Sequence, residues 1–154
     1  MIANNEKNLA SVIHFSALGK YFFPLGNLIF QILLWVFTKD KNSFYDQNGK
    51  AAINFQLSML LYGFSLGMVL LALIFIFVLG RAEEVAFQFE FYDFDYYPFS
   101  PGVWLRIFPV WLILTAVFAV LAYTFFELYA VITGGLQALH GKVHKYPLSI
   151  TFIK

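Results

Sequence analysis

Two long apolar stretches, residues 44–79 and 103–139, constrain the fold of this chain more than any other feature of its sequence. A helix rises about 1.5 Å per residue, so about 20 apolar residues cross a hydrocarbon core of about 30 Å, and both stretches exceed that length. Hydrophobic residues make up 60% of the chain and charged residues 12%, against roughly 45–50% and about 25% in soluble domains. We therefore predict an all-α integral membrane protein with one domain over residues 1–154.

The N-terminal quarter contains two shorter apolar segments, at about residues 9–22 and 25–38, separated by Pro24. Neither is long enough to cross a bilayer, and proline disfavours helical geometry in the residue before it. The segments form either one kinked span over 9–38 or two short helices in a hairpin that returns to the starting side. A single span would bury Lys20 near mid-membrane, at a cost of roughly 2.5–3.5 kcal/mol. We favour the hairpin, which together with the two long spans makes a four-helix transmembrane bundle.

The polar loop at residues 39–50 contains a helix start. Ser43 and Asp46 have the S-x-x-D spacing in which a serine hydroxyl accepts an amide hydrogen bond. Asp46 and Lys50 have the favourable order for an i,i+4 ion pair. Gly63 and Gly67 form a G-x-x-x-G pattern on the same helix, which allows another helix backbone to approach closely. A polar stripe is also predicted along one face of this helix, made of Asp46, Lys50, Asn54, Ser58, Tyr62 and Ser65.

Residues 81–102 form an acidic, aromatic loop between the two long spans. Its phenylalanines alternate with polar residues over 87–91, which predicts a strand-like or extended segment at the bilayer surface. The 39–50 loop carries three lysines, and the tail from residue 140 carries three more without an acidic residue. Because basic loops stay in the cytoplasm, we predict that both termini are cytoplasmic and that 81–102 is external. The expected location is the cytoplasmic (inner) membrane of a bacterium.

Glu127 and His14 are the first candidates for functional polar residues. Glu127 is the one acidic residue inside an apolar segment, and an unpaired carboxylate is expensive in lipid, so such residues are functional-site candidates. It could instead be structural and pair with Lys20, Lys50 or His14. His14 could act with Glu127 in a proton relay, because histidine titrates near neutral pH. It could also be a hydrogen-bonded packing residue.

Asn54 and Gln56 are further candidates, but they lie about 200° apart on a helix and cannot share one ligand-binding face. We expect Asn54 to form a hydrogen bond between helices instead of lining a pore. His140 and His144 have the spacing of a helical metal-binding pair, but Gly141 lies between them and no third ligand joins them. We therefore predict no metal site.

Several short motifs resemble one bacterial membrane family. They are P-L-G-N at 24–27 followed by Trp35, K-x-K-x-S-F-x-D at 39–46, G-K-x-A-x-N-F-Q at 49–56 and K-Y-P-L at 145–148. Together they resemble the small four-helix proteins classed as similar to the Tic-twenty component of chloroplast inner-envelope protein import, over about residues 8–79 and 115–154. The resemblance implies the four-helix architecture and, by analogy alone, a link to protein transport. Gln31 stands where that family often has a proline, and the loop at 81–102 looks longer and more aromatic than is typical of it.

The sequence contains no nucleophile–base pair, phosphate-binding loop, dinucleotide fingerprint or metal cluster, and it has no cysteine. We predict that the protein is not an enzyme and needs no cofactor. Its net charge of +1 argues against a nucleic-acid partner. The first hypothesis is a non-catalytic subunit or assembly partner of a complex in the lipid bilayer, bound to another membrane protein or to further copies of itself. The alternative is a small transporter or ion pathway that uses Glu127 and His14. A weaker third possibility is an adaptor that acts through residues 83–99.

Overall fold

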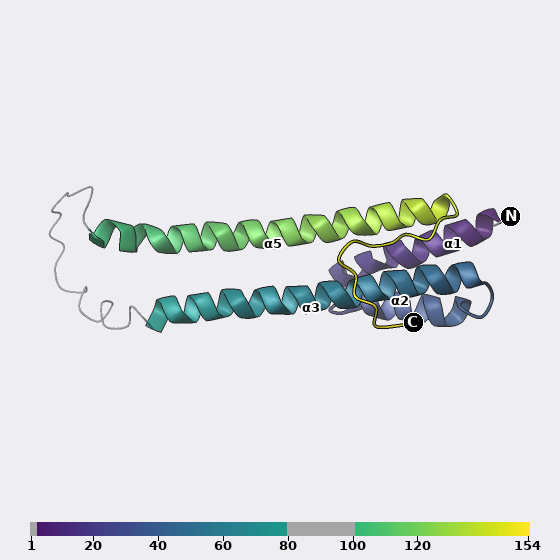
Figure 1. Cartoon of the computed structure of the whole chain (residues 1–154), viewed down its shortest axis with the longest axis horizontal. Helices are drawn as coiled ribbons and strands as arrows, with labels where there is room; N and C mark the ends of the chain where they lie inside the picture. The colour runs from purple at the N-terminus through teal and green to yellow at the C-terminus, as the bar shows by residue number, and fades with distance from the viewer. Residues whose placement is uncertain (1–2, 80–100) are drawn as a thin grey trace. The chain divides into compact units, whose positions relative to one another are not determined.

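The structure is a computed structural model that describes residues 3–79 and 101–154, and every regular element in this part of the chain is helical (Figure 1). For these described residues, the prediction of an all-α fold with four helices is confirmed. Residues 81–100 of the predicted external loop, with their expected extended segment, lie outside the described residues. The elements are α1 (Asn4–Phe15), the 3-10 helix η1 (Ser16–Tyr21), α2 (Gly26–Thr38), α3 (Ser43–Leu79) and α5 (Pro101–Leu139).

The chain divides into two compact units. One comprises Met1–Gly63 and Thr124–Lys154, and the other comprises Phe64–Tyr123. The described side chains of the second unit are mostly apolar and exposed. Ser43–Phe77 and Val110–Leu139 are each long and apolar enough to cross a membrane, and their most apolar windows are 0% and 6% buried. Helices of this length in a soluble core would be mostly buried, so their exposure favours a membrane environment.

Helix α1 begins at Asn4, five residues before the predicted start at residue 9. The Glu6 carboxylate accepts a hydrogen bond from the Ala3 backbone amide at 2.8 Å, which is half of a capping box. The polar residues before residue 9 therefore form the first helical turn. After Phe15 the chain tightens into η1, so the second half of the predicted helix over 9–22 is a 3-10 helix.

A turn at Pro24 and Leu25 joins η1 to α2, and these two elements pack against each other. Leu25 adopts a left-handed conformation with φ 62°, which is uncommon for a bulky residue. Gly19 and Gly26 lie at the contact. A Cβ atom on Gly26 would overlap the Gly19 carbonyl group, and one on Gly19 would overlap the Phe30 ring. The segments therefore meet through bare backbone, which only glycine permits.

Helix α3 is capped by Asn42 and not by the predicted Ser43, which is its first helical residue. The Asn42 side-chain oxygen accepts a hydrogen bond from the Phe44 amide at 3.0 Å. Asparagine is at least as good a cap as serine, but Asn42 is followed three positions later by Tyr45 and not by an acidic residue, so the S-x-x-D spacing selected Ser43 instead. The expected i,i+4 ion pair is present, with Lys50 Nζ 2.6 Å from Asp46 Oδ2.

Helix α5 ends in a Schellman motif. Gly141 is left-handed with φ 74°; its amide donates to the Ala138 carbonyl at 2.9 Å, and the Lys142 amide donates to the Gln137 carbonyl at 3.0 Å. Beyond this point the chain has no helix or strand. This tail runs back beside α3 and contacts it at Tyr62 and, near the end of the tail, at Asn54 (yellow in Figure 1).

Candidate functional site

The interior of the first compact unit is unusually polar for so hydrophobic a chain. Glu127, His14, Asn48, Gln31 and Gln56 are each at most 4% exposed. A buried polar group costs free energy unless it finds a hydrogen-bond partner, so these residues should be held by specific contacts. The contacts form an ion pair, a histidine–tyrosine network, an amide pair and a set of bonds to the tail.

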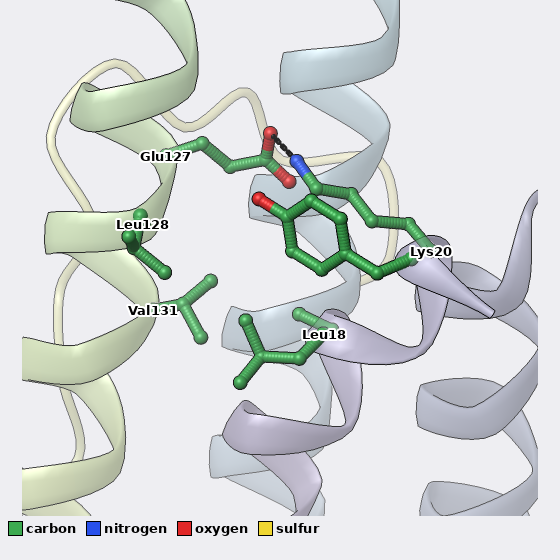
Figure 2. A pocket seen from close by; sticks show the side chains of 7 residues that line it. Leu18, Lys20, Glu127, Leu128 and Val131 are labelled. Atoms are coloured by element: carbon green, nitrogen blue, oxygen red, sulfur yellow. Dashed lines mark hydrogen bonds and ion pairs between the residues drawn. The ribbon is translucent and has the colours of Figure 1, made fainter.

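Glu127 on α5 and Lys20 on η1 form an ion pair, and their charged ends point toward each other (Figure 2). The Glu127 side chain is 5% exposed and the Lys20 side chain 26%. Lys20 Nζ also lies 5.2 Å from the centre of the Tyr21 ring, within cation–π range. Lys20 is thus the partner of Glu127 among the three that the sequence suggested. The pair borders a small pocket lined by Ala17, Leu18, Lys20, Tyr21, Glu127, Leu128 and Val131.

His14 is bound through both ring nitrogens. Nε2 lies 2.9 Å from Asn48 Oδ1, and Nδ1 lies 2.7 Å from the Tyr146 hydroxyl. Asn48 Nδ2 donates to the Phe44 carbonyl, so Asn48 Oδ1 is left as an acceptor and His14 Nε2 carries the proton. Tyr146 then donates to Nδ1. His14 and Glu127 are thus each bound to other groups, and the structure does not join them as the proton relay requires.

Tyr146 anchors the tail in this interior. Its ring stacks on Phe55 at a centroid distance of 4.2 Å and an interplanar angle of 12°. A Cβ atom on Gly134 would overlap the Tyr146 hydroxyl, so that glycine makes room for the tyrosine. Burial raises the pKa of the Tyr146 hydroxyl, which therefore stays protonated and able to donate to His14.

His144 packs edge-on against Tyr146, with ring centroids 4.6 Å apart. Burial lowers its pKa below the ordinary value for histidine. His140 does not join it, because His140 Nδ1 lies 2.7 Å from the Leu136 carbonyl oxygen of its own helix. Within residues 3–79 and 101–154, no group of three His, Asp or Glu side chains could hold a metal ion.

Gln56 points to α2 and not to the tail. Its Oε1 accepts a hydrogen bond from Asn27 Nδ2 at 2.7 Å, which links α3 to α2. Gln31 lies one turn beyond Asn27 and is 1% exposed. Among the described residues, neither Gln31 Oε1 nor Gln56 Nε2 has a hydrogen-bond partner. This chain therefore buries the Gln31 amide on α2 at the position where the sequence comparison led us to expect a proline.

Asn54 binds the tail, so the expectation of a hydrogen bond between helices is wrong for this residue. Its Oδ1 accepts hydrogen bonds from the amides of Phe152 at 3.0 Å and Ile153 at 2.8 Å. Its Nδ2 donates to the Ile153 carbonyl at 2.9 Å. A side-chain amide thus pairs with the backbone much as a neighbouring strand would. The expectation failed because the tail, and not a helix, covers this face of α3.

The next two residues of the predicted polar stripe of α3 continue the same contact. Ser58 Oγ accepts a hydrogen bond from the Ile150 amide at 2.7 Å, and the Tyr62 hydroxyl donates to the Leu148 carbonyl at 2.8 Å. We call Asn54, Ser58 and Tyr62 the tail-binding stripe. All of these hydrogen bonds join a side chain of the stripe to a backbone group of the tail. They therefore do not depend on the side chains of the tail.

The remaining candidates from the sequence are Asp46 and Lys50, which make structural contacts, and the glycines Gly63 and Gly67. Asp46 Oδ1 accepts a hydrogen bond from Trp35 Nε1 at 3.0 Å, which ties the end of α2 to the start of α3. Lys50 pairs with Asp46. A Cβ atom on Gly67 would meet no described atom within 4 Å. The proposal that Gly63 and Gly67 pack against another helix therefore stays a prediction.

Sequence reasoning missed Tyr146, Asn48 and the role of the tail. One signal was available: Leu148, Ile150 and Phe152 alternate with other residues, which is the pattern of an extended segment with two different faces. The three side chains are exposed, while the backbone groups of the same residues and of Ile153 bind α3. The partner of the stripe could not be read from α3 alone, because the two segments are about a hundred residues apart in the sequence.

A family model described as the magnetosome magnetite crystal formation protein family (MamF/MmsF) matches residues 5–153. No curated protein and no solved structure matches the chain. The resemblance to the Tic-twenty family is therefore wrong, and the link to protein transport loses its support. The motifs behind it lie at the turn after η1, at the start of α3 and at the tail anchor, where they make structural contacts of this chain. The chain belongs to the MamF/MmsF magnetosome magnetite crystal formation protein family.

Proposed function

We propose that this chain is a non-catalytic, multi-pass membrane protein of the magnetosome that takes part in magnetite crystal formation within a membrane assembly. The observation that carries the proposal is the family match over residues 5–153. Two helices of sufficient length and hydropathy to cross a membrane support the membrane location. The assembly would involve another membrane protein or further copies of the chain.

In the proposed placement, α3 and α5 cross the bilayer, and α1, η1 and α2 form a hairpin that enters it and returns. The exposed apolar side chains of α2 suit contact with lipid; they are Ile29, Phe30, Ile32, Leu33, Val36 and Phe37. The lysines of the 39–50 loop and of the tail favour the cytoplasmic side for both termini. Residues 81–100 would then face the opposite side.

The contacts of the polar interior favour a structural role over transport. A pathway built on Glu127 and His14 requires both side chains to face one water-accessible cavity. Instead Glu127 is paired with Lys20, and His14 is bound by Asn48 and Tyr146. These bonds hold the short helices and the tail against α3 and α5.

Deletion of the gene in a magnetosome-forming host tests the proposal. We expect crystals of altered size or shape in electron micrographs, normal crystals after complementation, and a fluorescent fusion that co-purifies with magnetosomes. Unchanged crystals together with a fusion protein absent from magnetosomes would refute it.

Topology is testable because the chain lacks cysteine. Single cysteines at Asn5, Ser100 and Ser149 can be treated with a membrane-impermeant thiol reagent in intact cells. We expect labelling from outside at position 100 alone. Labelling at position 5 as well would replace the hairpin with a single kinked span over residues 9–38.

A further inference from the structure

We infer that one end of the first compact unit binds the headgroups of anionic phospholipids through Lys7, Lys39, Lys41 and Lys142. We call this surface the basic end. Its ligand is a lipid whose phosphate-bearing headgroup has a net negative charge. The inference rests on the membrane location under the proposed function, and not on the role in crystal formation.

The start of α1 and the turn between α2 and α3 meet at the basic end (Figure 1). Asn42 Nδ2 donates a hydrogen bond to Glu6 Oε1 at 2.8 Å. Asn42 follows Lys41 in the chain, and Glu6 precedes Lys7. This bond therefore brings two of the four lysines to neighbouring positions, although they are more than 30 residues apart in the sequence.

The residues that follow α5 join the same end. Leu9 and Val143 pack against one cluster of buried side chains, which consists of Ala10, Phe44, Tyr45 and Ala138. Lys142 directly precedes Val143 in the chain. The basic end is thus assembled from three segments that are distant in the sequence.

These segments carry an excess of positive charge. Residues 3–10, 39–50 and 140–145 contain six lysines and three acidic residues, a net charge of +3 with neutral histidines. Glu6 is engaged by the Ala3 amide and by Asn42, and Asp46 pairs with Lys50. Within residues 3–79 and 101–154, none of the four lysines of the basic end forms an ion pair. Their charge is therefore available to an anionic partner.

Lys39 is positioned by a tryptophan that is itself held in place. Trp35 Nε1 donates to Asp46 Oδ1 at 3.0 Å, and a Cβ atom on Gly49 would overlap the Trp35 ring. Lys39 Nζ lies 5.2 Å from the centre of that ring, within cation–π range. An ammonium group has three donors, so Lys39 can contact the ring and still donate hydrogen bonds to a phosphate.

The surroundings of Trp35 favour a lipid over a soluble anionic partner. Leu33, Val36 and Phe37 are exposed apolar side chains of the same helix, and Phe37 is 72% exposed. Apolar side chains followed by tryptophan and then lysine have the order expected across a membrane boundary. A free phosphate or an acidic soluble protein would engage the lysines and leave the apolar side chains in water. A phospholipid covers both, with its acyl chains and its headgroup.

Quenching of tryptophan fluorescence by brominated lipids tests the inference with the full-length chain. Substitutions Trp104→Phe and Trp111→Phe leave Trp35 as the one tryptophan of three. The protein is placed in mixed vesicles of phosphatidylglycerol and phosphatidylcholine, in which either the first or the second lipid has brominated acyl chains. The ratio of the two quenching signals at equal lipid fractions gives the headgroup preference at Trp35.

A second chain keeps Trp111 instead of Trp35. The Trp111 side chain is 61% exposed on a candidate membrane span. Its quenching by either lipid reports insertion into the bilayer, separately from any headgroup preference at the basic end.

At low salt we expect Trp35 to contact phosphatidylglycerol at least about fivefold more readily than phosphatidylcholine, because lysines beside an anionic leaflet favour its lipids. Raising the salt to about 0.5 M should lower the preference at least about twofold by screening. Lys39→Gln combined with Lys41→Gln should bring the preference to less than about twofold. Lys154→Gln, at an exposed position after the Ile153 that binds Asn54, is the matched control and should keep the full preference. Circular dichroism verifies that every variant remains helical.

Two results at Trp35 would overturn the inference: a preference below about twofold in the chain with all its lysines, and an undiminished preference in the Lys39→Gln, Lys41→Gln chain. Quenching of Trp111 without quenching of Trp35 would also overturn it, because the basic end would then lie away from the bilayer. If neither tryptophan is quenched, the proposed membrane location fails, and the inference fails with it.

Discussion

Removal of one partner from the Lys20–Glu127 pair should show which of the two charges needs the other. In Lys20→Met, Glu127 remains at 5% side-chain exposure with no counter-charge, and breaking a buried pair in this way costs about 3–5 kcal/mol. In Glu127→Leu, the remaining Lys20 is 26% exposed and can extend its ammonium group toward water, so we expect a smaller loss of about 1–3 kcal/mol. The double variant replaces both charges with apolar groups of similar volume and should lie within about 1 kcal/mol of the wild type.

The free energy of unfolding can be measured in mixed micelles titrated with sodium dodecyl sulfate, with circular dichroism as the signal. The two single effects should fail to add by at least about 2 kcal/mol. Lys142→Met, at an exposed position, is the matched control and should change stability by less than about 0.5 kcal/mol. Additive single effects, or a Lys20→Met variant as stable as the control, would show that Glu127 does not depend on Lys20.

Three further predictions follow from the same set of contacts. Gly26→Ala should lower the free energy of unfolding by about 1–3 kcal/mol, because the new methyl group would overlap backbone atoms. The control Gly67→Ala, whose methyl group would meet no described atom, should be neutral or stabilising by up to about 1 kcal/mol. Equal effects of the two substitutions in the same titration would contradict the close backbone contact. Tyr146→Phe removes the donor to His14 and should cost about 1–3 kcal/mol, with Tyr146→Leu worse because the stacked ring is lost as well. Burial lowers the pKa of His144 in the folded state, so the stability that this neutral histidine contributes is present above its unfolded pKa of about 6.5 and lost as the pH falls through the lower folded value. The free energy of unfolding, measured between pH 8 and pH 4, should fall on acidification, and the fall should be smaller in His144→Gln. An unchanged pH profile in that variant would refute the assignment.

The two long helices were predictable because their signal is local and long. A mostly apolar stretch of more than 30 residues leaves no alternative element, and the observed bounds of α3 and α5 differ from the predicted ones by at most two residues. The start of α1 was missed because the sequence was read by hydropathy, while Glu6 stabilises the first turn through a backbone amide. Hydropathy does not detect a cap of this kind.

The polar site was predictable in composition but not in pairing. Glu127, His14 and Asn54 stand out because polar groups are rare in apolar helices, and all three are buried. Their partners, Lys20, Tyr146 and the backbone of the tail, are separated from them by about a hundred residues or more. No periodicity in one segment specifies a contact at that distance, so the choice between a relay and separate structural bonds required the three-dimensional structure.

The tail poses a physical problem that the stripe solves. A helix satisfies its own amides and carbonyls, but an extended segment does not, and in an apolar environment each unmet backbone group is costly. The tail lies beside a helix that is apolar enough to span a membrane, so it needs hydrogen-bond partners supplied from outside its own backbone. Asn54 supplies three of these bonds from one side chain. Asn54→Leu should therefore lower the free energy of unfolding by more than the change in side-chain volume and burial alone would predict, because three backbone groups of the tail lose their partner. Truncation after Pro147 should remove most of this additional loss, because those backbone groups are then absent. A hydrogen-exchange measurement on the amides of Phe152 and Ile153 would test the first part, since their protection should collapse in Asn54→Leu while that of the α5 amides persists.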